Sequence, residues 1–366
     1  MKEKDKRTDA ARRTLLVSAV LLCAAILAGL LLSGCAGSQA ENEGAGTQTE
    51  GGAGAAQEER TPVAYLGGNP LYLDEAVFYT RMLQEQWEYA YYESFGEEMW
   101  QQEATEDGQT FADALKSDVL ELLTEIELLC SHAEEYGAEL TEGEKAEIAG
   151  RAGNFMASNT PEVLEAAGAT AESVKLYLTR NELAARTAQQ IKDTYEPVID
   201  EEAAKVGKLT YCLFSSMGTY DEEGNHTPFT EEELSRIRQD AEDFAVRAQE
   251  LGDISAAGEE ISHTLIDVYF NDSTNGGAHE KMAEAARALP VGQVSEVIET
   301  EDGWYVVQHI SDYDESATQE NLEAMEEQAR EEYLLELEAQ WEQEGPLEVD
   351  TEVWDTVVVD KMLTAP

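Results

Sequence analysis

The spacing of apolar residues changes near Val206, and this change constrains the fold more than any other feature of the sequence. From residue 74 to about residue 195, apolar residues recur every three or four positions, which is typical of amphipathic helices. Over residues 208–214, apolar and aromatic residues alternate with others, which predicts a β-strand. The sequence therefore predicts a mainly helical region followed by a smaller region with strands. The lack of regular strand and helix alternation argues against a parallel α/β sheet.

The helical region begins with a short strand. Residues 63–66 predict this strand, a turn follows at residues 67–70, and Asp74 begins the first helix. Further along, Thr141 and Glu144 have the spacing of a capping box, which places the start of another helix between them. These signals locate two element boundaries from local chemistry alone.

The smaller region mixes strands and helices. A capping box at Thr230 and Glu233 begins a helix that ends near Leu251. The other predicted elements are a strand at residues 265–270, a short helix at 281–289, and strands at 294–299 and 304–310 joined by a tight turn at 301–303. Two strands so close in the chain favour an antiparallel sheet, and the sequence as a whole predicts an α+β fold.

The tail contains a long charged helix over residues 318–344 and a predicted strand over residues 353–359. A lone strand is not stable, and the strand at residues 63–66 is also short of partners. We therefore expect these two strands to pair and the tail to pack on the N-terminal helical region, with Trp354 buried against it.

The N-terminus has the pattern of an export signal. Basic residues precede an apolar run over residues 15–32, and the run ends in Leu32-Ser33-Gly34-Cys35, which resembles the lipobox of bacterial lipoproteins. Cys35 is the predicted lipidation site, and residues 36–62 lack large apolar side chains, which predicts a disordered tether. The alternative is an uncleaved membrane anchor, since about 18 apolar residues nearly span a bilayer. Both alternatives place the remaining chain outside the cytoplasm.

The charge excludes one class of partner. The chain has 77 acidic and 24 basic residues and a formal net charge of -53. Nucleic-acid binding is excluded because it requires Lys and Arg to neutralise phosphates. The acidity favours cationic or unfolded polypeptides as partners, or serves solubility alone. Cys130 and Cys212 lie in separate segments, and we predict that they do not form a disulfide.

Three segments carry a family resemblance. The spacing of Glu284-Ala285-Ala286, Gly292-Gln293-Val294-Ser295 and Gly303-Trp304-Tyr305-Val306-Val307 is similar to the last third of parvulin-type peptidyl-prolyl isomerase domains. Residues 119–142 and 63–79 resemble the helical chaperone region of extracytoplasmic foldases of the PrsA and SurA type. The resemblance implies a helical chaperone region built from both termini, with a parvulin-like domain inserted as a small antiparallel sheet flanked by helices. The expected divisions are a signal peptide (1–34), a lipidated cysteine and tether (35–62), a helical region (63–205), a parvulin-like domain (206–313) and a tail (314–366).

The resemblance also implies a catalytic site. The two histidines usual in parvulins fall on Tyr211 and Tyr305, the phenylalanine of the apolar pocket on Met282, and the pocket methionine on Ala278. A third polar position has no clear counterpart around residues 265–268. Isomerisation needs no nucleophile, and a tyrosine in an apolar pocket can still donate a hydrogen bond. The alternative is that both tyrosines are simple core residues.

Three functions follow from these patterns. The first is a membrane-anchored prolyl isomerase and chaperone for unfolded exported polypeptides, and the second is a chaperone whose parvulin-like domain does not catalyse. A solute-binding lipoprotein is a remote third, disfavoured by the helical region. No cofactor or metal is predicted, because the histidines lack paired ligand spacing and most are expected at the surface; they are His132, His226, His263, His279 and His309. The oligomeric state is left open.

Overall fold

The computed structural model describes residues 60–105, 108–220, 224–274 and 276–363. Cys35, the signal segment and nearly all of the predicted tether lie outside these residues. The described chain forms two compact units, one with residues up to Tyr195 and from Glu331 onward, and one with Glu196–Arg330. Within the described residues, no helix is long and apolar enough to cross a membrane.

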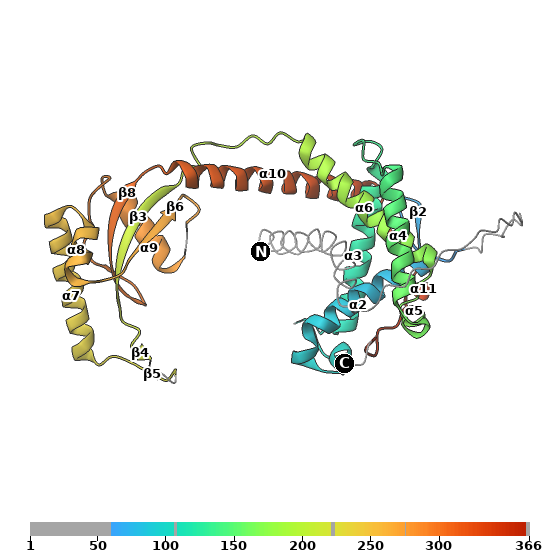
Figure 1. Cartoon of the computed structure of the whole chain (residues 1–366), viewed down its shortest axis with the longest axis horizontal. Coiled ribbons are helices and arrows are strands. Elements are labelled where there is room, and N and C mark those ends of the chain that lie inside the picture. The colour runs from blue at the N-terminus through green and yellow to red at the C-terminus, as the bar shows by residue number, and fades with distance from the viewer. Residues whose placement is uncertain (1–59, 106–107, 221–223, 275, 364–366) are drawn as a thin grey trace, which may run out of the picture. The chain divides into compact units, whose positions relative to one another are not determined.

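The first unit is mainly helical, as predicted (Figure 1). The capping box predicted at Thr141 and Glu144 is present, and Thr110 with Asp113 forms another. The helical elements are α2 (Leu73–Phe95), the 3-10 turn η1 (Met99–Gln101), α3 (Phe111–His132), α4 (Glu142–Ser158), α5 (Pro161–Ala166) and α6 (Ala171–Thr194).

The core of the first unit is built on the predicted apolar stripe of α3. Leu115, Val119 and Ile126 are fully buried, and they pack with residues of α2, α4 and α6 in one hydrophobic cluster. Across this cluster, the Phe78 and Tyr177 rings meet edge to face with centroids 5.2 Å apart. The spacing of apolar residues in the sequence therefore predicts which side of α3 is buried in this unit.

The two ends of the described chain meet in a three-stranded antiparallel sheet. Its strand order is β2 (Asn69–Tyr72), β1 (Pro62–Leu66) and β9 (Leu347–Val349). The tail thus pairs with the first strand, with Ala64 opposite Val349. Pairing covers the second edge of β1, which would otherwise be open.

The predicted strand at residues 353–359 is wrong. Asp350 accepts a hydrogen bond from the Val353 backbone N–H at 3.2 Å and caps the short helix α11 (Thr351–Trp354). The strand that pairs with β1 lies just before this cap, in β9. Trp354 is nevertheless buried in the core of the first unit, as expected, with 6% of its surface exposed.

The second unit contains a four-stranded antiparallel sheet. Its strand order is β6 (Leu265–Phe270), β3 (Gly207–Ser215), β8 (Gly303–Ser311) and β7 (Ile298–Glu299). Helices α7 (Glu231–Leu251) and α8 (Ile254–Ile261) cover one face, and α9 (Gly277–Ala288) covers the other (Figure 1). A small hairpin of β4 (Thr219–Tyr220) and β5 (His226–Thr227) follows β3. The α+β fold class is as predicted.

Strand β7 is shorter than the predicted segment 294–299. At Ser295 the backbone N–H donates to Val307 O at 2.8 Å, but the Val307 N–H donates to the Ser295 hydroxyl oxygen at 2.9 Å. A side chain thus takes the place of a backbone carbonyl in the ladder. The regular strand is therefore confined to the last two residues before the turn.

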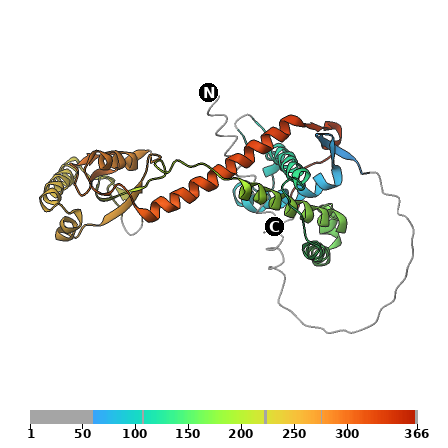
Figure 2. The same ribbon diagram turned by 90° about the horizontal axis from the view of Figure 1, so that it is seen from above.

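Helix α10 (Glu315–Glu344) is continuous in both views of the molecule (Figures 1 and 2). Its beginning belongs to the second unit, where the Thr318 hydroxyl accepts from the Val206 N–H at 3.0 Å. Its end belongs to the first unit, where the Tyr333 and Tyr195 rings stack with centroids 4.1 Å apart. Each end is thus fixed by side-chain contacts within its own unit.

Candidate functional site

The two predicted site tyrosines lie on the same face of the second unit's sheet. The register pairs Tyr211 with Val307 and Leu213 with Tyr305, so the tyrosines are diagonal neighbours on strands β3 and β8. Their ring centroids are 5.3 Å apart, at an interplanar angle of 57°. The structure therefore brings together two side chains that are distant in the sequence.

The third predicted site residue lies in the same cluster. Met282 is buried on the inner side of α9 and belongs to the cluster that contains Tyr305, with Tyr211 and Ala278 partly buried against it. The helical spacing of Met282, Ala283 and Ala286 turns these three side chains toward the sheet. We call Tyr211, Tyr305 and Met282 the tyrosine site.

A turn residue completes the site. The Tyr305 hydroxyl donates a hydrogen bond to Asp302 Oδ2 at 3.1 Å, across the turn between β7 and β8. Burial, with smaller contributions from the Asp302 carboxylate, raises the pKa of Tyr305 to about 12. Tyr305 is therefore a neutral phenol near neutral pH. The turn at residues 301–303 is as predicted, whereas the Asp302 contact was missed; an aspartate three residues before the tyrosine is a sequence signal for it.

The third polar position implied by the parvulin resemblance, around residues 265–268, is also unfilled in the structure. Asp267 lies opposite Thr210 in the β3–β6 register, on the sheet face away from Tyr211. Its carboxylate binds Lys208 Nζ at 2.8 Å and accepts from the Thr210 hydroxyl at 2.6 Å, and these two hydrogen bonds lower its pKa. Asp267 is thus held on the other face and adds no polar group to the tyrosine site.

The tyrosine site combines an apolar floor with phenol groups. Tyr305 and Met282 are 4% and 1% exposed, whereas Tyr211 is only half-buried and forms the accessible rim. The part of the site that a prolyl ring could contact is therefore the rim at Tyr211, and a phenol can donate to a carbonyl whose amide is twisted. The site offers no nucleophile and needs none for isomerisation.

One histidine departs from the expected surface location. His309 is buried on β8, with its Nδ1 2.8 Å from Leu289 O and its ring against Phe270. Among the described residues, no group of three His, Cys, Asp or Glu side chains is placed to hold a metal ion. His309 therefore packs as a structural residue at the far end of the sheet from the turn.

The first unit has an exposed group of aromatic rings near the end of α2. Trp87, Tyr91, Phe95 and Phe111 contact one another, with Tyr91 and Phe95 centroids 6.2 Å apart and Phe95 and Phe111 centroids 4.8 Å apart. Tyr91 is 41% exposed and Phe95 is 38% exposed. We call these four residues the α2 aromatic cluster. It presents apolar area to solvent through Tyr91 and Phe95.

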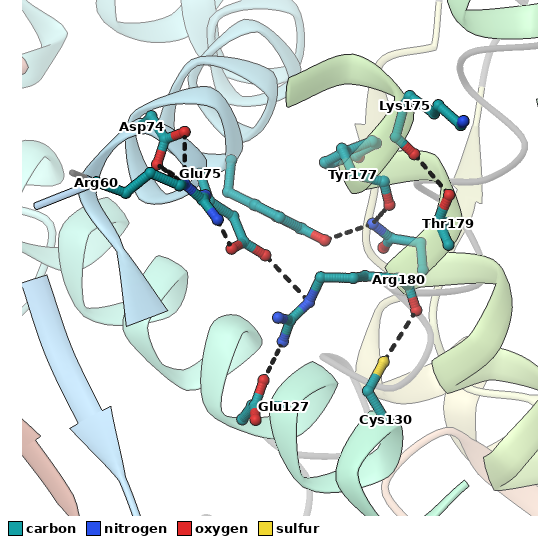
Figure 3. A network of polar contacts seen from close by, with 11 residues as sticks. Arg60, Asp74, Glu75, Glu127, Cys130, Lys175, Tyr177, Thr179 and Arg180 are labelled. Atoms are coloured by element: carbon teal, nitrogen blue, oxygen red, sulfur yellow. Dashed lines mark hydrogen bonds and ion pairs between the residues drawn. The ribbon is translucent and has the colours of Figure 1, made fainter. Parts of the chain in front are cut away.

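A buried ionic network joins α2, α3 and α6 (Figure 3). Arg180 Nε lies 3.0 Å from Glu75 Oε1, and Arg180 Nη2 lies 2.5 Å from Glu127 Oε2. Burial raises the pKa of Glu75, and the Arg180 and Arg60 guanidinium groups oppose this shift. Because one cation bridges the buried Glu75 and the partly buried Glu127 on different helices, we interpret the network as structural.

Cys130 and Cys212 are both free thiols. Burial raises the pKa of each thiol to about 12, so neither forms a thiolate at neutral pH. Cys130 lies beside the ionic network, where its Sγ donates to Arg180 O at 3.5 Å. Neither of these two described cysteines is placed for thiolate chemistry.

Comparison with known proteins gives matches to solved structures only, since no family model and no curated protein matches the chain. The foldase protein PrsA from Lactococcus lactis is 14% identical, with 82% of this chain and all of that chain covered and a TM-score of 0.34. The chain resembles PrsA foldases and SurA-like chaperones. PrsA from Streptococcus pneumoniae is 18% identical over 70% of this chain and 98% of that chain, with a TM-score of 0.30.

A third match comes from Campylobacter jejuni, in work on PEB4 and Cj1289, which are described as SurA-like chaperones. It is 10% identical over 79% of this chain and 98% of that chain, with a TM-score of 0.28. These are the foldase types that the sequence resembles.

Proposed function

We propose that the chain is an extracytoplasmic foldase, a peptidyl-prolyl isomerase and chaperone for exported polypeptides. The observation that carries the proposal is that Tyr211 and Tyr305 on one face of the sheet meet Met282 of α9, because the parvulin resemblance assigns the site to these three positions. In this proposal, the second unit is the isomerase domain. The first unit, which contains both ends of the described chain, is the chaperone region.

The energetic demand on the tyrosine site is modest. The barrier to X-Pro rotation is about 18–20 kcal/mol, and a thousandfold acceleration requires lowering it by only about 4 kcal/mol. The prolyl ring would pack at the half-buried rim formed by Tyr211, whose hydroxyl would donate to the carbonyl of the twisted amide. Met282, which is 1% exposed, would support this rim from below. Tyr305 packs against Tyr211 and orients its ring.

The α2 aromatic cluster supports the chaperone part of the proposal. Exposed aromatic rings bind apolar segments of any sequence at low cost in side-chain entropy. The strong negative charge of the chain keeps the protein soluble while this apolar area stays exposed. In this proposal the clients are unfolded or partly folded exported chains, bound without a sequence motif.

Location follows from the N-terminal segment. The basic residues, the apolar run and Cys35 support export and attachment to the outer face of the cell membrane through a lipid on that cysteine. The acidic segment that follows would hold the folded units near the membrane without binding its anionic headgroups. The partners proposed are therefore the membrane, through the lipid, and exported polypeptides.

A proline-peptide isomerisation assay with the purified chain tests the catalytic proposal. We expect turnover above the uncatalysed rate, and a loss of about tenfold or more for Tyr211→Phe, which removes only the hydroxyl. Tyr269→Phe is the matched control, because Tyr269 is on the same sheet but pairs with Lys208 on the opposite face. Equal activity of the two variants would place catalysis elsewhere.

A second candidate function is a chaperone that binds without catalysis. Its support is the near-complete burial of Tyr305 and Met282 and the engagement of the Tyr305 hydroxyl by Asp302, which together leave Tyr211 as the accessible polar group. This candidate predicts no isomerase turnover by the wild-type chain, together with suppression of the aggregation of a denatured test protein. Deleting residues 206–313 should then leave suppression intact.

A further inference from the structure

An open hollow lies in the same unit as the tyrosine site, on the other face of the sheet. It has a volume of about 680 Å³ and is lined by the end of β3, helix α7 and helix α8. Its floor is apolar, with Phe214 and Phe244 packed at a centroid distance of 5.5 Å. On the rim, Ile261 is 51% exposed and His263 stacks on Phe214. We call this the α7–α8 hollow.

The rim of the hollow carries uncompensated negative charge. Arg247 is already neutralised, because its guanidinium binds both carboxylate oxygens of Glu260 at 2.7 and 2.8 Å. Asp243 accepts only from the neutral Gln239 amide, at 2.9 Å. Within the described ranges, no Lys or Arg forms an ion pair with Asp240 or Asp243. Among the described residues, the rim therefore presents two carboxylates without a cationic partner beside an apolar floor.

From this combination we infer that the α7–α8 hollow binds an extended polypeptide segment in which a bulky apolar side chain is flanked by Lys or Arg. The apolar side chain would fill the space over Phe214 and Phe244. The neighbouring cation would bind Asp240 and Asp243, which lie on the exposed side of α7. An acidic or purely polar segment lacks one of these two interactions and binds weakly.

The inference rests on the proposed function in that its ligand is an unfolded client. The hollow would be a second client-binding site in the same unit. The tyrosine site faces α9, whereas the hollow faces α7 and α8. A client segment of the stated composition is thus held on one face, independently of a proline on the other. Mutations in the tyrosine site should leave this binding unchanged.

The test uses the full chain and a fluorescein-labelled peptide with a central leucine between lysines, measured by fluorescence anisotropy. The variant Asp240→Asn with Asp243→Asn should weaken binding by about threefold to tenfold, as expected for two partly exposed ion pairs, and the effect should shrink at high salt. A matched control, Glu284→Gln with Glu296→Gln, removes the same charge elsewhere in the unit and should not change the affinity. Equal affinities for the two double variants would overturn the inference.

A second measurement locates the peptide. A photoactivatable phenylalanine replaces the central leucine, and crosslinks are mapped by mass spectrometry. Crosslinks to α7 or α8 that are lost in Ile261→Glu support the inference. Crosslinks confined to the α2 aromatic cluster or the tyrosine site would overturn it and leave the proposed function standing. Absence of any binding would overturn the inference, whereas the proposed function is tested separately by the isomerisation assay.

Discussion

Replacing Trp354 with alanine should destabilise the first unit strongly. Trp354 is 6% exposed in the core of that unit, and Lys116 Nζ lies 5.0 Å above its ring and donates to its backbone carbonyl at 3.1 Å. Cutting a buried tryptophan to alanine costs about 3–5 kcal/mol. For a domain of this size, each kcal/mol lowers the melting temperature by about 2–4 °C, so we expect a drop of roughly 6–20 °C.

Urea unfolding gives the free energy of this change, and hydrogen exchange shows where it acts. Amides of α2, α3 and α6 should lose protection, whereas those of β3 and β8 should not. Val358→Ala is the matched control in the same tail, because Val358 is 51% exposed and should cost less than about 0.5 kcal/mol. A Trp354→Ala variant as stable as this control would refute the packing of the tail on the N-terminal helices.

Three further changes have definite expected outcomes. Cys35→Ala should abolish labelling by a radioactive fatty acid, and persistent label would contradict the lipid anchor. Arg180→Met should cost about 3–5 kcal/mol in urea unfolding, since it removes the cation from the partly buried Glu127 and leaves the buried Glu75 with only its longer contact to Arg60. Arg238→Met in an exposed pair should cost little, and similar losses for the two variants would contradict the structural role of the network. Tyr305 has a pKa of about 12 in the folded chain and about 10 in the unfolded chain, so the stability it contributes below pH 10 is lost as pH rises toward 12. Tyr305→Phe should flatten this decline in the free energy of unfolding with pH. Equal slopes for the wild-type chain and the variant would contradict it.

The helical region could be predicted well because its signals are local. The apolar stripe of α3 and the capping box at Thr141 and Glu144 depend on residues within one or two turns of one another. Strand β6 was predicted with its observed bounds for a similar reason, since it is a short apolar run between loops. Segments whose structure depends on residues close in the sequence can therefore be predicted from one sequence.

The tail shows where prediction from local sequence patterns fails. The run at residues 353–359 is rich in Val and Trp and has the composition of a strand, yet its first residues form α11. Asp350 decides the outcome, because its side chain caps a helical turn, and β1 pairs with the three residues before it instead. The prediction that the tail pairs with residues 63–66 was right, although the pairing segment was misplaced.

The site was predicted only as far as the family resemblance extends. The resemblance selected Tyr211, Tyr305 and Met282, and the structure places them in one cluster. The depth of burial of Tyr305 and the contact with Asp302 depend on the order of strands in the sheet and on the geometry of a turn, which no local pattern records. The α7–α8 hollow was missed because its lining comes from three separate elements.

Refolding of a denatured protein whose slow phase is limited by proline isomerisation tests the central proposal most directly. With the full chain added in catalytic amounts, we expect the slow phase to accelerate and the aggregated fraction to fall. Tyr211→Phe should lose the acceleration and keep the protection against aggregation. A slow phase and an aggregated fraction that both stay unchanged with the wild-type chain would contradict a foldase function.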